Sequence, residues 1–71
     1  MSTGLREYRS EFVRKYIYQG RAESLLAVLA ARDIDVTDGV RDRITGCTDP
    51  DQLDRWIRRA VSVGAATELF D

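Results

Sequence analysis

The chain has 71 residues, enough for one domain at most, with 11 basic and 12 acidic residues and a net charge of −1. This balance argues against a general nucleic-acid binder, which usually has a clear basic excess. Because Cys47 is the only cysteine and histidine is absent, a disulfide within one chain is excluded and a zinc site is not expected.

A membrane protein is not expected either. No apolar run approaches the roughly 18 residues of a membrane span, and the first residues lack the apolar core of a signal peptide. We therefore expect a cytoplasmic protein with a reduced thiol and no contact with a membrane. A domain this small buries too little surface to be very stable alone. With no metal, cofactor or disulfide expected, oligomerisation is the predicted reinforcement.

Residues 5–32 predict one long helix that follows a flexible polar lead at residues 1–4. Good helix formers dominate and only Gly20 interrupts them, so the helix is either continuous or kinked there. At about 100° per residue, its apolar side chains form two faces that differ in direction by roughly 140°. The leading face comprises Leu5, Tyr8, Phe12, Val13, Tyr16 and Ile17. The second face comprises Ala22, Leu25, Leu26, Val28 and Leu29.

Residues 37–71 predict a small helical cap on the long helix. A loop at residues 33–36 is followed by Thr37, a good N-cap for a short helix over about residues 38–46. Val40, Ile44 and Cys47 recur at i, i+4 and i+7, which predicts a buried stripe with Cys47 as a small core residue. Gly46 can end this helix.

A third predicted helix begins at Thr48, the expected N-cap, and runs to about residue 63. Its amphipathic stripe has the spacing i, i+3, i+4, i+7 and i+8 and comprises Leu53, Trp56, Ile57, Ala60 and Val61. A short last helix at about residues 66–70 can fold Leu69 and Phe70 back as a lid. The chain is thus predicted to be a single all-α domain, a long helix followed by a small bundle of two or three short helices.

The leading face is the predicted oligomer interface. A helix of about 28 residues spans about 42 Å, whereas a compact chain of this length has a diameter of roughly 30 Å. The short helices can cover only its second half, and monomers rarely leave such an apolar patch in water. We expect antiparallel or parallel pairing with a second copy to cover the leading face, most simply in a twofold dimer. The alternative is a monomer in which a kink at Gly20 folds the first half onto its own core.

Catalytic chemistry is not predicted. Without histidine, no nucleophile can be paired with an imidazole base, and no glycine-rich phosphate loop occurs. Asp33, Asp35 and Asp38 lack the spacing of a calcium loop and are expected to serve as loop and cap residues. We therefore expect no catalytic residue, no cofactor-binding residue and no metal ligand, in a protein that is not an enzyme.

Three arginines on the third predicted helix come nearest to a basic patch: Arg55, Arg58 and Arg59. Asp51 and Asp54 lie four residues before Arg55 and Arg58, so surface ion pairs are the first expectation. Contact with a phosphate or an acidic partner is the alternative. In that alternative the segment 38–63 acts like a helix-turn-helix, and the chain is a small DNA-binding accessory. Nucleic acid is the less favoured partner because the charge is balanced.

Several segments of the chain resemble a known family. The matching residues are 8–16, 19–23 (QGRAE), 25–32 (LLAVLAAR), 34–36, 40–44, 47–53 (CTDPDQL) and 68–70 (ELF). They are similar to the C-terminal tail that follows the nuclease domain in actinobacterial members of the recombination-promoting nuclease / putative transposase family, a PD-(D/E)XK-type group. The resemblance implies an upstream nuclease domain as a partner. It implies no nuclease activity here, because the family's catalytic residues lie upstream and Val13 stands where the motif needs an acid before Lys15.

The function that these observations predict is a non-catalytic module for homo-oligomerisation or protein interaction. It would pair subunits through the leading face and, following the resemblance, position nuclease domains as a dimer. The DNA-binding accessory is the main alternative. A regulator that masks another protein is a third interpretation, for which no residue pattern discriminates.

Overall fold

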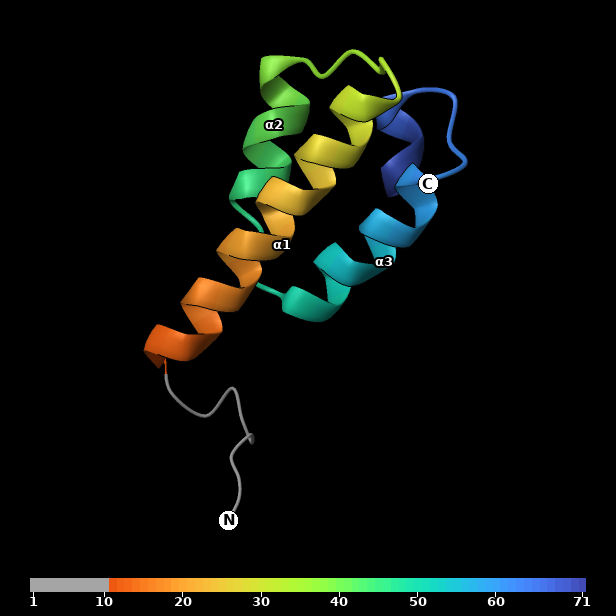
Figure 1. The fold of residues 1–71 in the computed structure, drawn as a ribbon. Coiled ribbons are helices and arrows are strands. Elements are labelled where there is room, and N and C mark those ends of the chain that lie inside the picture. The colour runs from red at the N-terminus through yellow and green to blue at the C-terminus, as the bar shows by residue number, and fades with distance from the viewer. Residues whose placement is uncertain (1–10) are drawn as a thin grey trace.

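Residues 11–71 are described by a computed structural model, and they form an all-α fold, as predicted. The elements are α1 (Glu11–Ala31), α2 (Asp38–Thr45), α3 (Pro50–Ala60) and the 3-10 helix η2 (Ala66–Phe70). Figure 1 shows α2 and α3 lying along one half of α1, while the first turns of α1 extend beyond the bundle. Two residues of the leading face, Leu5 and Tyr8, lie outside the described residues.

The predicted long helix is confirmed from Glu11 onward, and α1 runs through Gly20 to Ala31 without a break. A Cβ atom built on Gly20 would meet no neighbouring group within 4 Å, so no close approach inside the described chain requires glycine there. The kink considered as an alternative does not occur in the described part of the helix, and its first turns do not fold back onto the bundle (Figure 1). The two halves of α1 therefore have different surroundings.

α1 ends in a left-handed turn at Asp33, which has a φ of 58°. The N–H of Asp33 donates to the carbonyl of Ala30 at 3.0 Å, and the N–H of Ile34 donates to the carbonyl of Leu29 at 2.9 Å. These two bonds form a Schellman motif, which satisfies carbonyls that the helix end would leave unpaired. The turn also brings Ile34 against the core.

α2 and α3 begin at side-chain caps, one of which is as predicted. Thr37 Oγ1 accepts a hydrogen bond at 3.2 Å from a backbone N–H three residues on, which confirms Thr37 as the N-cap of α2. For α3 the prediction of Thr48 is wrong, because Asp49 is the N-cap and its Oδ1 accepts from the N–H of Asp51 at 3.0 Å. Pro50 explains the shift, since proline occupies the first helical position and holds the preceding residue extended.

α3 is shorter than predicted. It ends at Ala60 rather than near residue 63, and the chain turns immediately afterwards. The turn leaves Val61 65% exposed, so its predicted place in the buried stripe is wrong, and Val63 takes a core position instead with 7% exposure. The rest of the stripe is confirmed by the buried or half-buried side chains of Leu53, Trp56, Ile57 and Ala60.

The core lies between the second half of α1 and the three shorter helices. Its largest fully buried side chains come from every element: Leu25, Leu29, Ile44, Leu53 and Leu69. η2 folds back as predicted, and the Phe70 ring meets the Trp56 ring edge-on with centroids 5.0 Å apart. The guanidinium of Arg43 lies 4.0 Å from the centroid of the Phe70 ring. Cys47 is half-buried and packs at the margin of the core.

Candidate interaction surface

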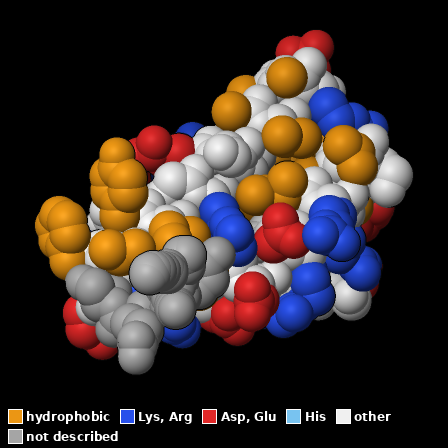
Figure 2. Space-filling model, turned by 60° about the horizontal axis from the view of Figure 1, so that its bottom comes forward, with side chains coloured by type: hydrophobic (Ala, Val, Ile, Leu, Met, Phe, Trp, Pro, Cys, Tyr) orange, Lys and Arg blue, Asp and Glu red, His pale blue; other side chains and the backbone are white. Residues whose placement is uncertain are grey.

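The leading face is largely exposed where the structure describes it. Phe12 is 77% exposed, Tyr16 is 76% exposed and Val13 is 43% exposed. Ile17 is half-buried and forms the margin toward the bundle. Figure 2 shows hydrophobic side chains at the end of the molecule where α1 begins, and further hydrophobic side chains, interspersed with charged ones, over the opposite part of this view. Four of the six predicted interface residues therefore lie together on the first turns of α1.

The change in direction between the two apolar faces explains this exposure. Ala22 is the first buried residue of α1, and Leu25 and Leu29 are fully buried in the core. Because this second face points roughly 140° away from the leading face, the helices that cover it leave the leading face outside. The predicted separation of the two faces is thus confirmed for the described residues.

The side of α1 that carries Tyr16 continues past Gly20 with short or polar side chains. Gln19, Gly20 and Glu23 are exposed and, with Tyr16, line a shallow hollow on the helix surface. A rotation of about 100° per residue places all three within roughly 60° of Tyr16. Ala27 is exposed one turn further along the same side. The pattern of apolar residues alone does not reveal this continuation, although the helical period does.

Two arginines fix α1 to the bundle by bonds to backbone carbonyls. Nη1 of Arg21 donates to the carbonyl of Pro50, at the start of α3, at 2.9 Å. Nη1 of Arg32 donates to the carbonyls of Ala60 at 2.8 Å and Val63 at 2.6 Å, at the other end of α3. A cation is favoured there because the last carbonyls of a helix lack partners and carry partial negative charge. α1 is thus held at both ends of α3, which sets the direction in which its first turns project.

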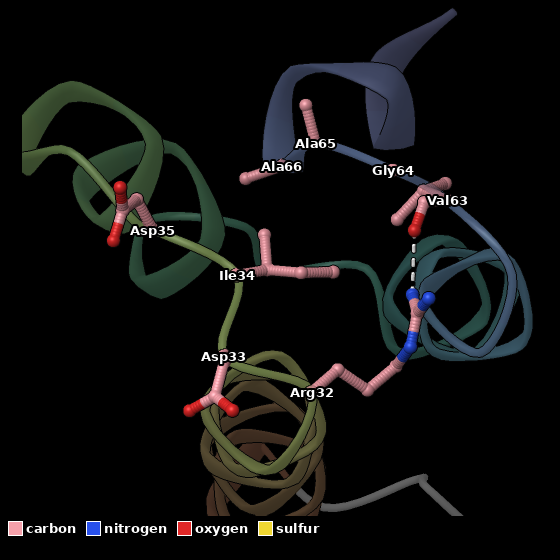
Figure 3. Close-up of a pocket in the computed structure, with 8 residues that line it drawn as sticks. All are labelled: Arg32, Asp33, Ile34, Asp35, Val63, Gly64, Ala65 and Ala66. Atoms are coloured by element: carbon pink, nitrogen blue, oxygen red, sulfur yellow. Dashed lines mark hydrogen bonds between the residues drawn. The ribbon is translucent and has the colours of Figure 1, made fainter.

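The Arg32 contact lies in an open hollow between the end of α1 and the segment that precedes η2 (Figure 3). The guanidinium points toward the carbonyl of Val63, while the Asp33 carboxylate points to the other side of the helix end. The charge of Arg32 is therefore engaged by backbone carbonyls. This arrangement is a helix-capping contact between two parts of the chain, and its role is to hold them together.

Two arginines of the candidate basic patch have partners on α3 itself. Arg58 pairs with Asp54 as predicted, with Nη2 and Oδ2 3.1 Å apart. Arg55 donates instead to Oε1 of Gln52 at 2.8 Å, so the predicted pair with Asp51 is wrong. The residues three and four positions before Arg55 lie on the same side of the helix as its side chain. Arg55 bonds to the nearer of the two, Gln52. Arg58 is 79% exposed, so its ion pair contributes little to stability.

The third arginine of that patch, Arg59, donates from Nη2 to the carbonyl of Glu68 at 3.0 Å. Glu68 also accepts a hydrogen bond at Oε1 from the N–H of Gly64, so the turn before η2 is held on both sides. α2 and α3 each pack mainly against α1 rather than against each other. This arrangement does not favour a helix-turn-helix, in which the two helices form one unit.

No metal-binding group of three or more Asp, Glu, Cys or His side chains occurs within residues 11–71. Asp33, Asp35 and Asp38 are exposed at the loop and first turn of α2. The Cys47 thiol donates to the carbonyl of Asp49 at 3.6 Å. In the part of the chain that the structure describes, no helix has the length and apolar character needed to cross a membrane.

Fold and surface together define a class of protein, a small all-α domain with one largely exposed apolar stretch on its longest helix. No protein-family model matches the chain, and searches of curated proteins and of solved structures give no match. The resemblance to the tail of a nuclease family therefore stays a prediction.

Proposed function

We propose that the chain is a non-catalytic module that joins two copies of itself through the leading face of α1. The observation that carries this proposal is Tyr16, an aromatic side chain that is 76% exposed in the second turn of α1, the helix whose first turns extend beyond the bundle (Figure 1). Phe12 and Val13 add exposed apolar surface on the same side. Contiguous apolar surface of this kind is typical of protein–protein interaction sites.

A second copy is the simplest partner for this surface. In a twofold dimer every interface residue is used twice, so one short stretch of helix supplies both sides of the contact. Burial of apolar surface stabilises by about 25 cal/mol per Å², and one aromatic side chain buries about 150–250 Å². A domain of 71 residues gains much from such burial because its own core is small.

The resemblance to a nuclease-family tail suggests a use for the dimer, which would hold two upstream nuclease domains together. The proposal of self-association does not depend on this use. A reading frame for a nuclease domain directly upstream in the genome would support it. A dimer without such a neighbour would leave self-association standing and remove the nuclease role.

The DNA-binding alternative has no specific contact in its favour, because the three arginines of α3 that would contact phosphates already have partners within the chain. A gel-shift assay with duplex DNA at low salt separates the two functions, since phosphate contacts are strongest there. Absence of a shift at tens of micromolar protein would remove the alternative. A shift lost in the triple variant Arg55→Ala, Arg58→Ala, Arg59→Ala would establish it.

Size-exclusion chromatography with light scattering tests the proposal on the full chain. Over a concentration series from about 1 to 500 µM, the mass should rise from one chain toward two. Tyr16→Glu should hold the mass at one chain, because a charge would be buried at the contact. Val61→Gln is the matched control, since Val61 is also an exposed apolar residue but lies on the turn after α3. A monomer at every concentration, or a Tyr16→Glu variant that associates normally, would overturn the proposal.

A further inference from the structure

The exposed side of α1 consists of two unlike halves. Its first half projects a large ring, Tyr16, whereas Gly20 at the junction and Ala27 in the second half carry short side chains, with the polar Glu23 between them. Between the two halves lies the hollow lined by Tyr16, Gln19, Gly20 and Glu23. A helix with bulk at one end and little at the other fits a second copy of itself best when the two run in opposite directions. The bulky half of each then lies on the short-chained half of the other.

The charged side chains of α1 favour the same antiparallel orientation. Lys15 and Glu23 are exposed, have opposite charge and lie eight residues apart, with Gln19 midway between them. Neither makes an ion pair with any residue that the structure describes. All three residues belong to one row at intervals of four, which runs from the flank of the exposed side at Lys15 toward its middle at Glu23. A twofold axis at Gln19 would set each Lys15 opposite the Glu23 of the other copy.

We propose that α1 pairs with α1 of a second copy in antiparallel orientation, around a twofold axis close to Gln19. Tyr16 of each copy then enters the hollow of the other between Gln19 and Glu23. Lys15 of each copy faces Glu23 of the other, and the two Gln19 side chains meet at the axis. This geometry rests on the proposed function, and it adds the orientation, the register and the charged contacts of the same surface.

The bundle leaves room for this arrangement. Ala27, Ala30 and Ala31 are exposed, whereas the buried residues Leu25 and Leu29 face α2 and α3 on the other side. The first turns of one α1 can therefore lie along the second half of the other without meeting the shorter helices. A parallel pairing would instead set Lys15 beside Lys15 and Glu23 beside Glu23, where like charges repel.

Cross-linking between two single-cysteine variants tests the orientation. Cys47→Ser removes the natural thiol, and Lys15→Cys and Glu23→Cys are then made separately in that background. Mixed and oxidised, the two variants should form the 15–23 heterodimer, because a disulfide needs Cα atoms about 4.4–6.8 Å apart. Either variant alone should cross-link poorly, since equivalent residues would lie about 12 Å apart along the antiparallel helices. Efficient 15–15 and 23–23 cross-links would overturn the antiparallel geometry.

Exchanging the charges at positions 15 and 23 provides a second test of the proposed contact. Lys15→Glu and Glu23→Lys should each raise the dissociation constant of the dimer by roughly 5- to 30-fold, because two attractive contacts become repulsive. The double variant should return to within about threefold of the unmodified chain. A double variant as weak as the weaker single one would reject the contact. If the unmodified chain is a dimer but both tests fail, only this geometry is wrong; if it is a monomer, the proposed function itself fails.

Discussion

The two halves of α1 belong to one continuous helix but are stabilised in different ways. The second half is held by the core, in which Leu25 and Leu29 are fully buried, and by the bonds of Arg21 and Arg32 to carbonyls at the ends of α3. In the first half only the residues near its end reach the core, where Tyr18 packs against it, and the turns before them extend beyond these contacts with Tyr16 76% exposed. An isolated helix of two or three turns is marginal in water. The first half is therefore the part of α1 with most to gain from a second chain.

The largest expected difference between the halves is the effect of removing an apolar side chain. Leu25→Ala should lower the free energy of unfolding by about 2–5 kcal/mol, because it opens a cavity in a fully buried site. Tyr16→Ala should change it by less than about 1 kcal/mol when measured on the monomer. Urea denaturation of both variants at low micromolar concentration checks the contrast. Equal losses would mean that both halves belong to the same core.

Removing a side chain that makes a polar contact of α1 should also lower the free energy of unfolding, but by a smaller amount. Arg32→Ala should lower the free energy of unfolding by about 1–2 kcal/mol, because the carbonyls of Ala60 and Val63 lose a charged donor. Arg58→Ala, at an exposed ion pair, should cost less than about 0.5 kcal/mol. Thermal unfolding followed by circular dichroism compares the two variants. An Arg32 variant as stable as the Arg58 variant would show that the α1–α3 contact does not need this guanidinium.

Gly20 lies where the two halves join, and its replacement should move two quantities in opposite directions. Gly20→Ala should stabilise the monomer by about 0.5–1 kcal/mol, because alanine is the better helix former and its Cβ meets no neighbouring group. The same methyl group should weaken the dimer, since it would occupy the hollow that receives Tyr16 in the proposed geometry. Unfolding and light scattering of one preparation measure both. A more stable monomer with unchanged association would place Gly20 outside the interface.

The smallest expected effect on the free energy of unfolding is at the C-terminal end of α1. Asp33→Gly should raise the free energy of unfolding by about 0.5 kcal/mol, because glycine adopts the positive φ of 58° without the cost of a Cβ atom. Asp35→Gly is the control, since only Asp33 has a positive φ among the described residues other than glycine, and the control should be neutral or destabilising. Chemical denaturation measures the free energy of unfolding of both variants. A destabilised Asp33→Gly variant would mean that its carboxylate contributes more than the strain costs.

Features that depend on neighbouring residues were predictable from the sequence. The helical period separated the two faces of α1, and Thr37 was recognisable as a cap because its partner lies three residues away. The N-cap of α3 was predicted wrongly because Thr48 and Asp49 are both good N-cap residues. The position of Pro50 determines which of the two caps the helix. The early end of α3 displaced Val61 from the core.

Contacts between distant residues were not predictable. The bonds from Arg21 to Pro50 and from Arg32 to Val63 join residues 29 and 31 positions apart. They depend on how α3 packs against α1, which no local pattern specifies. The candidate surface was predicted in its apolar part, the leading face, but the pattern of apolar residues did not include its continuation through Gln19 and Glu23, because these side chains are polar.

The central claim is that the side of α1 carrying Tyr16 binds a second copy of the chain. Amide NMR spectra of the full chain, recorded across a concentration series, test it residue by residue. Signals of Tyr16, Gln19 and Glu23 should shift with concentration, while those of α2 and η2 should stay unchanged. Spectra that do not change with concentration, or shifts confined to α2 and η2, would contradict the account.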